Sequence, residues 1–208
     1  MLKNTDHKKK EAMAKRRKRQ ILSAAREVFS QKGFAEATTA EIAQQAGVSE
    51  GTIYNYFESK RDLLVSLIGG YALDESLLNL FRSPSMGNMD SLPLLLEDRI
   101  EIGFENSDLL TLLLAEIQCS PEFGEQYAKQ VLVPGVALLK AYLDMRVKIG
   151  TLRPVDTEVV SRIIVGMVVG LIAVHQIEGG EGFLGKYPIK DLAEEVANIM
   201  TVGLGTKK

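Results

Sequence analysis

The chain has 208 residues, of which 46% are hydrophobic and 25% charged, and its formal net charge is -2. This length is sufficient for a small module and a larger body, each with its own core. The lone cysteine, Cys119, excludes an intrachain disulfide, and with only two histidines no Cys/His spacing typical of a metal site is available. We therefore expect no metal or other cofactor, and this cysteine usage fits a reducing cytoplasm.

Charge is distributed unevenly along the chain. Residues 1–61 carry 13 Lys and Arg against 7 Asp and Glu, a net +6, whereas residues 62–208 carry 12 against 20, a net -8. Clustered basic side chains attract a phosphate backbone and an acidic segment is repelled by it. We therefore expect residues 1–61 to form a nucleic-acid-binding domain, and residues 62–208 to form a domain that regulates it and dimerises.

Apolar residues recur three and four positions apart along most of the chain, and alternating strand patterns are weak, which predicts an all-α fold of about nine helices. A first helix is expected to end at Gly33. Thr38 and Glu41 form a capping box that opens a short second helix, which Gly47 ends, and Ser49 is placed to cap a third.

A fourth helix is predicted over residues 59–81, followed by a break at 83–88. Gly69 and Gly70 fall inside this helix, where a kink or, as we favour, a close helix contact would explain them. Further helices are predicted at 92–105, 108–118, 121–148, 157–178 and 189–202, and Pro134 is expected to kink or split the 121–148 helix. The uncharged run 163–174 is too short to span a bilayer and is expected to be a buried helix.

The second and third predicted helices form a helix-turn-helix pattern, in which Ile53 and Phe57 lie four apart and face inward. The pattern continues into a larger set of residues that together resemble the TetR family of transcriptional regulators: Gly33-Phe34, Thr38-Thr39, Ile42, Ala46-Gly47-Val48-Ser49, Gly51-Thr52-Ile53-Tyr54, Tyr56-Phe57 and Lys60. This resemblance implies a ligand-responsive DNA-binding homodimer. It also implies that Lys60 contacts a DNA phosphate, and residues 150–156 look like the linker before the family's dimerisation helices.

Several side chains of this motif suit DNA contact, because a helix of this kind enters the major groove with its first residues at the base edges. The predicted DNA-binding residues are Thr38, Thr39, Glu50, Gly51, Thr52, Tyr54, Asn55, Tyr56 and Lys60. Asn55 suits adenine, Gly51 permits close backbone approach, and the hydroxyls suit phosphates. Two alternatives stay open: Tyr54 as a half-buried core residue, and Glu50 as a partner of the helix dipole.

The segment 8–19 carries eight basic residues and one acidic residue. Beside a helix-turn-helix it is expected to add phosphate or minor-groove contacts. The alternative is a solvated, disordered tail.

A small DNA-reading head normally works in pairs, so a dimer surface is expected. The candidates lie on the last two helices, which the family pairs across a two-fold axis: Ile163, Met167, Gly170, Leu171, Val174, Leu192, Val196 and Met200. Gly166 and Gly170 would permit close approach of two helices, with packing inside one chain as the alternative.

The resemblance also implies an effector cavity among the middle helices, and the leucine-rich segments there suit a lipophilic ligand such as an acyl chain. Five polar candidates for ligand contact are Arg99, Glu116, Gln118, Tyr142 and His175. For any one of them we favour the alternative, which is a surface position or a satisfied polar group in the core.

The sequence thus predicts a sequence-specific regulator, a repressor by the family's commoner habit, that a small molecule releases from a palindromic operator. A TetR-like architectural DNA-binding protein that senses no ligand is the alternative. An enzyme is disfavoured because none of the recognisable catalytic or nucleotide-binding motifs occurs. A membrane-surface role for the basic segment is disfavoured by the adjacent DNA-reading motif.

Overall fold

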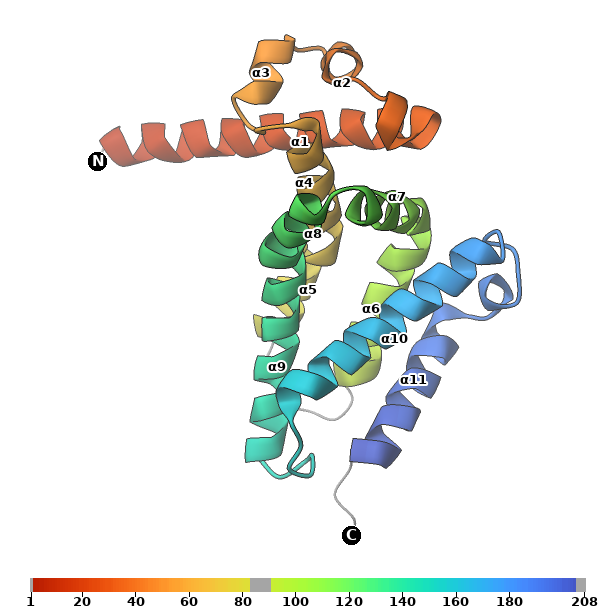
Figure 1. Ribbon diagram of the computed structural model, residues 1–208. Helices are drawn as coiled ribbons and strands as arrows, with labels where there is room; N and C mark the ends of the chain where they lie inside the picture. Colours follow the sequence, from red (N-terminus) through yellow and green to blue (C-terminus); the bar gives the residue numbers. More distant parts are fainter. Residues whose placement is uncertain (1, 83–90, 205–208) are drawn as a thin grey trace. The chain divides into compact units, whose positions relative to one another are not determined.

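The computed structural model describes residues 2–82 and 91–204, which fold into helices joined by short connections (Figure 1). The chain forms two compact units, Met1–Ile68 and Gly69–Lys208, which we call the head and the body. The boundary between the two units lies inside helix α4 (Lys60–Ala72). The domain boundary predicted after residue 61 falls near the start of the same helix.

The head contains α1 (Leu2–Glu36), α2 (Thr39–Gln45), α3 (Glu50–Tyr54) and the start of α4. Gly33 interrupts α1 with φ 74° and ψ 169°, which agrees with the helix end predicted there. The basic segment 8–19 is not a disordered tail, because it continues α1 as helix (Figure 1). The head therefore presents its positive charge on a regular helix.

The core of the head follows the predicted apolar spacing. Ile21, Ala25 and Phe29 of α1 are buried, as are Ile53 of α3 and Phe57, which follows α3. Phe29 also packs against Phe34, with ring centroids 5.3 Å apart.

The predicted single helix over residues 59–81 is wrong, because α4 ends at Ala72 and a separate helix, α5 (Glu75–Arg82), follows it. Asp74 starts the new helix by accepting a hydrogen bond from the amide of Leu77 at 3.0 Å. Arg99 ends the old one by donating to the carbonyls of Tyr71 and Ala72 at 3.1 and 3.2 Å. The break is thus set by a side chain 25 or more residues away in the sequence.

The two adjacent glycines of α4 differ. A Cβ on Gly69 would lie 3.1 Å from Cγ2 of Val131, whereas one on Gly70 would have nothing within 4 Å. The close contact predicted for the pair therefore holds at Gly69.

The remaining helices of the body largely match the prediction. They are α6 (Ser91–Glu105), α7 (Ser107–Cys119), α8 (Pro121–Tyr127), η2 (Ala128–Leu132), α9 (Val133–Lys148), α10 (Thr157–Ile177), η3 (Leu184–Lys186) and α11 (Ile189–Leu204). The predicted break at 83–88 lies outside the described residues.

Pro134 divides the helix predicted over 121–148. The five residues of η2, which directly precede α9, adopt a π-helical turn. Proline has no amide hydrogen, and its ring clashes with the carbonyl four residues earlier, so the wider turn accommodates it.

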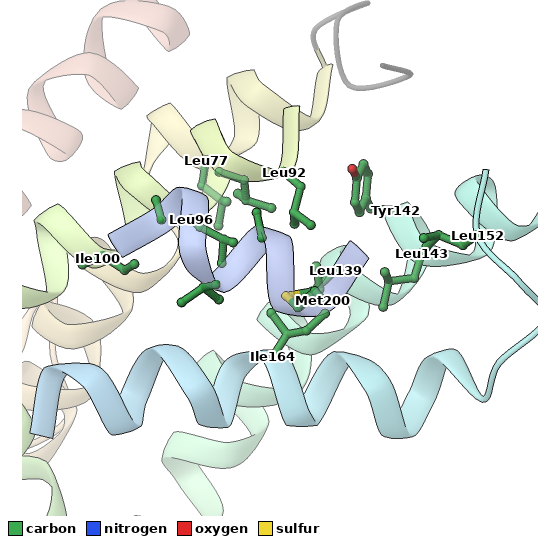
Figure 2. Packing of buried hydrophobic residues seen from close by; sticks show 14 residues of the cluster. Leu77, Leu92, Leu96, Ile100, Leu139, Tyr142, Leu143, Leu152, Ile164 and Met200 are labelled. Carbon is green, nitrogen blue, oxygen red and sulfur yellow. The ribbon is translucent and has the colours of Figure 1, made fainter. Parts of the chain in front are cut away.

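The core of the body gathers side chains from five helices, as Figure 2 shows for Leu77, Leu96, Leu143, Ile164 and Met200. Helix α6 packs against both α10 and α11. The core holds α11 by a full stripe of side chains. It holds α10 by a narrower face.

Helix α10 is less buried than the sequence suggests. Only Thr157, Ser161 and Ile164 are buried, so the buried helix expected over 163–174 is wrong for this single chain. Among the described residues this is the one helix long and apolar enough to cross a membrane by length and composition, which is weak evidence by itself. Its exposed apolar surface requires another explanation.

Candidate nucleic-acid interface

The N-terminus of α2 is built by the predicted capping box. The amide of Glu41 donates to Thr38 Oγ1 at 3.2 Å, and the amide of Thr38 donates to Glu41 Oε2 at 3.1 Å. Hydrogen bonds from Lys32 and then from Thr38 lower the pKa of the Glu41 carboxyl. The carboxylate therefore stays ionised and holds the start of α2.

The turn and the third helix also form as predicted. Gly47 has φ 61°, and Ser49 caps α3 by accepting from the amide of Thr52 at 3.2 Å. Because Ile53 and Phe57 are buried on one side, the opposite side of α3 faces solvent.

That outward side carries the predicted reading residues. Glu50, Gly51 and Asn55 are exposed, and Thr52 and Tyr56 are half-buried. Tyr54 is 53% exposed, so the alternative that it belongs to the core is wrong.

Three of these side chains bridge α2 and α3. Thr39 Oγ1 donates to Glu50 Oε1 and lies 3.2 Å from the hydroxyl of Tyr54. The Glu50 carboxylate therefore accepts a hydrogen bond from the Thr39 side chain. It also lies in the first turn of α3. This contact fixes two predicted DNA-binding residues of α3 to the start of α2 before any DNA is bound.

Lys60 is the first residue of α4, as the resemblance implied, and its ammonium contacts the end of α1. Its ammonium donates to the carbonyls of Phe34 at 2.7 Å, Ala35 at 3.2 Å and Ala37 at 2.8 Å. An ammonium has three hydrogens, and three carbonyls accept here. In this structure the ammonium therefore contacts the end of α1, and the phosphate contact of Lys60 stays a prediction.

The basic segment of α1 is largely exposed. Two of its cations have contacts within the head: Lys18 lies 5.1 Å above the Phe57 ring, and Arg17 donates to Gln20 at 3.0 Å. An α-helix does not fit the narrow minor groove, so this helical form favours phosphate contacts over minor-groove insertion.

The predicted dimer residues separate into three groups, which are exposed, half-buried and buried. Ile163 and Val174 are 55% and 43% exposed, and Gly170 is exposed with open space around it. Met167, Leu171 and Leu192 are half-buried.

Two members of the predicted set are corrected. Val196 and Met200 are 8% and 6% exposed because they fill the core of their own chain, so they are not available to a partner.

Two exposed residues of α10, Val159 and Ile177, are absent from the predicted dimer surface. They continue the α10 surface at the helical spacing of 4, 7, 11, 15 and 18 residues from Val159: Ile163, Gly166, Gly170, Val174 and Ile177. That spacing was readable in the sequence. We call this set of six residues the α10 stripe.

The five predicted ligand residues have different surroundings. Gln118 is exposed and Glu116 half-buried on α7. Tyr142 is a core residue that packs edge-on to Phe81, with ring centroids 6.3 Å apart. His175 stacks on Phe104 at 3.9 Å, and its Nδ1 is buried without a hydrogen-bond partner in the described part of the chain.

Arg99 has a structural place. In addition to the carbonyls at the end of α4, its guanidinium pairs with Asp74 at 3.0 Å and with Asp98. Its side chain is only 14% exposed. The core alternative therefore describes Arg99 and Tyr142 better than ligand contact does.

Comparison with known proteins agrees with this architecture. Residues 21–67 match the family model for bacterial regulatory proteins of the tetR family, and residues 104–202 match that for the C-terminal domain of AefR-like transcriptional repressors. The HTH-type transcriptional regulator YdgC of Bacillus subtilis is 30% identical over 197 residues, covering 90% of this chain and 92% of YdgC.

One further relative is named for fatty acid metabolism, and one solved structure of similar fold contains an acyl-CoA. The fatty acid metabolism regulator protein of Bacillus subtilis is 50% identical over 48 residues, but the match covers only 23% of this chain and 25% of that protein. The crystal structure of the transcriptional regulator FadR from Bacillus subtilis in complex with stearoyl-CoA has a TM-score of 0.72 at 23% identity, covering 88% of this chain and 97% of that one.

The capped helix-turn-helix, the helical body and these matches lead to one assignment. The relatives are transcriptional regulators and not enzymes. The chain belongs to the TetR family of transcriptional regulators, and its head is the family's DNA-binding helix-turn-helix domain.

Proposed function

We propose that the protein is a cytoplasmic, homodimeric repressor that binds a palindromic operator and is released from it by a lipophilic effector. The observation that carries DNA reading is the geometry of α3. Its inner side is anchored by Ile53 and Phe57, and its outer side presents Gly51, Tyr54 and Asn55. A rigid helix with polar groups outward suits the major groove.

The α10 stripe supports the homodimer. It leaves Ile163, Val174 and Ile177 exposed on one face of a 21-residue helix, and Ile199 of α11 is exposed as well. Contiguous exposed apolar surface of this kind marks an interaction site, and a second copy of the same helix would cover it. The open space beside Gly166 and Gly170 would let two such helices approach closely.

Selection of bound DNA from a random library tests this part of the proposal. A dimer with two equal heads should enrich a palindrome whose half-site centres are about one helical turn apart. Enrichment of a single half-site, or of no sequence, would contradict sequence-specific reading by a dimer.

For the effector we propose a long-chain acyl-CoA. The support is the family match, the likeness to a regulator whose structure contains stearoyl-CoA, and a body core built largely of leucine, with isoleucine and methionine. Because Arg99 is already paired with two carboxylates, we do not assign it to the effector's charged group.

Thermal melting and operator release with stearoyl-CoA, stearate and free coenzyme A test the effector. Stearoyl-CoA should raise the melting temperature and release the operator, because a ligand that binds the folded state stabilises it. Release by stearate alone would reassign the effector to the free acid. A flat response to all three would favour the architectural DNA-binding protein that senses no ligand.

A further inference from the structure

Two aromatic side chains are exposed on the connection between α10 and α11 (Figure 1). Phe183 is 64% exposed and Tyr187 is 46% exposed, and their rings pack on each other with centroids 4.8 Å apart. Ile177, the last residue of α10, is 83% exposed, and η3, which directly follows Phe183, packs against α10. Exposed apolar residues that gather in this way mark an interaction site, whereas isolated ones do not.

The connection is held in one conformation by its own contacts. Gly179 and Gly180 turn the chain with φ of 76° and 78°. The amide of Leu184 donates to Glu178 Oε2 at 2.9 Å. A Cβ on Gly185 would overlap the carbonyl oxygen of Gly180, so the beginning and the end of the connection touch each other. The aromatic pair therefore lies on an ordered loop.

His175 supports this loop from below. Its ring stacks on Phe104 of α6 with centroids 3.9 Å apart. A Cβ on Gly180 would lie 3.8 Å from Nε2 of His175, and one on Gly185 would lie 3.7 Å from Cε1. The loop thus packs on α10 and, through His175, on α6. An interface that is ordered in advance loses little conformational entropy on binding.

The α10 stripe by itself is small for a dimer interface. Its exposed side chains, together with Ile199 of α11, offer on the order of 300 Å² of apolar surface, because each is only partly exposed. A stable interface buries about 800 Å² on each partner, and roughly 65% of a homodimer interface is apolar, which requires about 500 Å². The exposed parts of Phe183 and Tyr187 add on the order of 200 Å².

We propose that Phe183 and Tyr187 extend the dimer interface beyond the α10 stripe and dock on a second copy of this chain. The inference rests on the homodimer of the proposed function. The stripe ends at Ile177, directly before the connection that carries the aromatic pair, so a copy that covers the whole stripe also reaches this connection. Rigid aromatic side chains at an interface carry a large share of the binding free energy.

The first test measures the dissociation constant of the dimer by sedimentation of the full chain over a series of concentrations. The double variant Phe183→Ser with Tyr187→Ser leaves the α10 stripe intact and should raise this constant about 100-fold, or about tenfold for each ring. Lys186→Ser, exposed on the same loop, is the matched control and should change it by less than about twofold. An unchanged dissociation constant in the double variant would overturn the proposal.

A tryptophan on the loop gives an independent readout, because the chain contains no tryptophan of its own. Phe183→Trp keeps an aromatic ring in the pair. Its emission should move to shorter wavelength, and its quenching by acrylamide should fall, as the protein concentration passes through the dissociation constant. Tyr54→Trp, on the exposed side of α3, is the matched control and should show neither change.

The two readouts separate this proposal from the homodimer on which it rests. An indole at position 183 that stays exposed in a sedimenting dimer would overturn the docking of the loop and leave the homodimer intact. A wild type that sediments as a monomer at all concentrations would contradict both. Shielding of the indole only after operator DNA or stearoyl-CoA is added would assign the aromatic pair to that ligand and would also overturn the proposal.

Discussion

The head and the body differ in what they leave exposed. The head buries its apolar residues and presents polar groups on α3 and cations on α1. The body does the reverse on α10, where apolar residues are exposed, while the side chain of Arg146 is buried near the ring of Tyr142. The exposed groups of each unit therefore indicate the kind of partner that would cover them.

This difference separates two kinds of evidence. An exposed polar helix end identifies a charged partner by its chemistry, here DNA. An exposed apolar stripe identifies only that water is unfavourable there, so its partner is argued from symmetry. Four sets of variants test this difference between the head and the body.

The largest effect is expected at the α10 stripe. Ile163→Glu places a charge within the proposed dimer surface and should give monomers in sedimentation. Affinity for a full palindrome should fall more than about 100-fold, because two linked heads gain from effective concentration and a single head does not. Val169→Glu, on the same helix but off the stripe, is the control and should remain dimeric. Persistent dimers in Ile163→Glu would move the interface elsewhere.

A smaller effect is expected at the end of α4. Arg99→Met removes the cation that pairs with Asp74 and Asp98 and should lower the free energy of unfolding by about 3 kcal/mol in a denaturant titration. Arg162→Met breaks an exposed pair with Glu158 and should change it by less than about 1 kcal/mol. Unchanged stability in Arg99→Met, together with loss of stabilisation by stearoyl-CoA, would instead return Arg99 to the ligand residues.

On α3 a single reading residue should matter in a base-specific way. Asn55→Ala should cost about 1–3 kcal/mol in operator binding and relax the preference at one base pair of each half-site. Repeated selection from the random library measures this. Gln44→Ala, exposed on α2 but outside the predicted contacts, serves as the control. A uniform loss over all sequences would make Asn55 a phosphate contact.

The smallest effect concerns the capping box of α2. The pKa of Glu41 in the folded head lies below its ordinary value of 4.5. Its contribution to stability is therefore present above the unfolded pKa and is lost as the pH falls through the lowered folded pKa. The stability difference between the wild type and Glu41→Gln should shrink between about pH 6 and about pH 3 in urea titrations. Glu36→Gln is the control, and a pH-independent difference for Glu41→Gln would exclude this role.

The head was predictable because its signals are local. Thr38 with Glu41, Gly47, and Ser49 lie within a few residues of the helix ends that they define, and Ile53 with Phe57 share a face by spacing alone. The contacts of Lys60 with the end of α1 were not predictable, because the carbonyls that it binds lie 23 to 26 residues earlier in the chain.

In the body, residue spacing predicted which helix faces are apolar but not what packs against each face. The stripe containing Val196 and Met200 is apolar like that of Ile163 and Val174, yet the first pair fills the core and the second faces solvent. Arg99 was equally ambiguous until Asp74 and the end of α4 were found beside it.

The all-α class, the capped helix-turn-helix and the positive head follow from the amino-acid sequence alone, because helix periodicity, capping and net charge depend on neighbouring residues. The tertiary structure decided where α4 ends, what Lys60 and Arg99 bind, and which face of α10 is free. Each of these depends on segments distant in sequence that folding brings together.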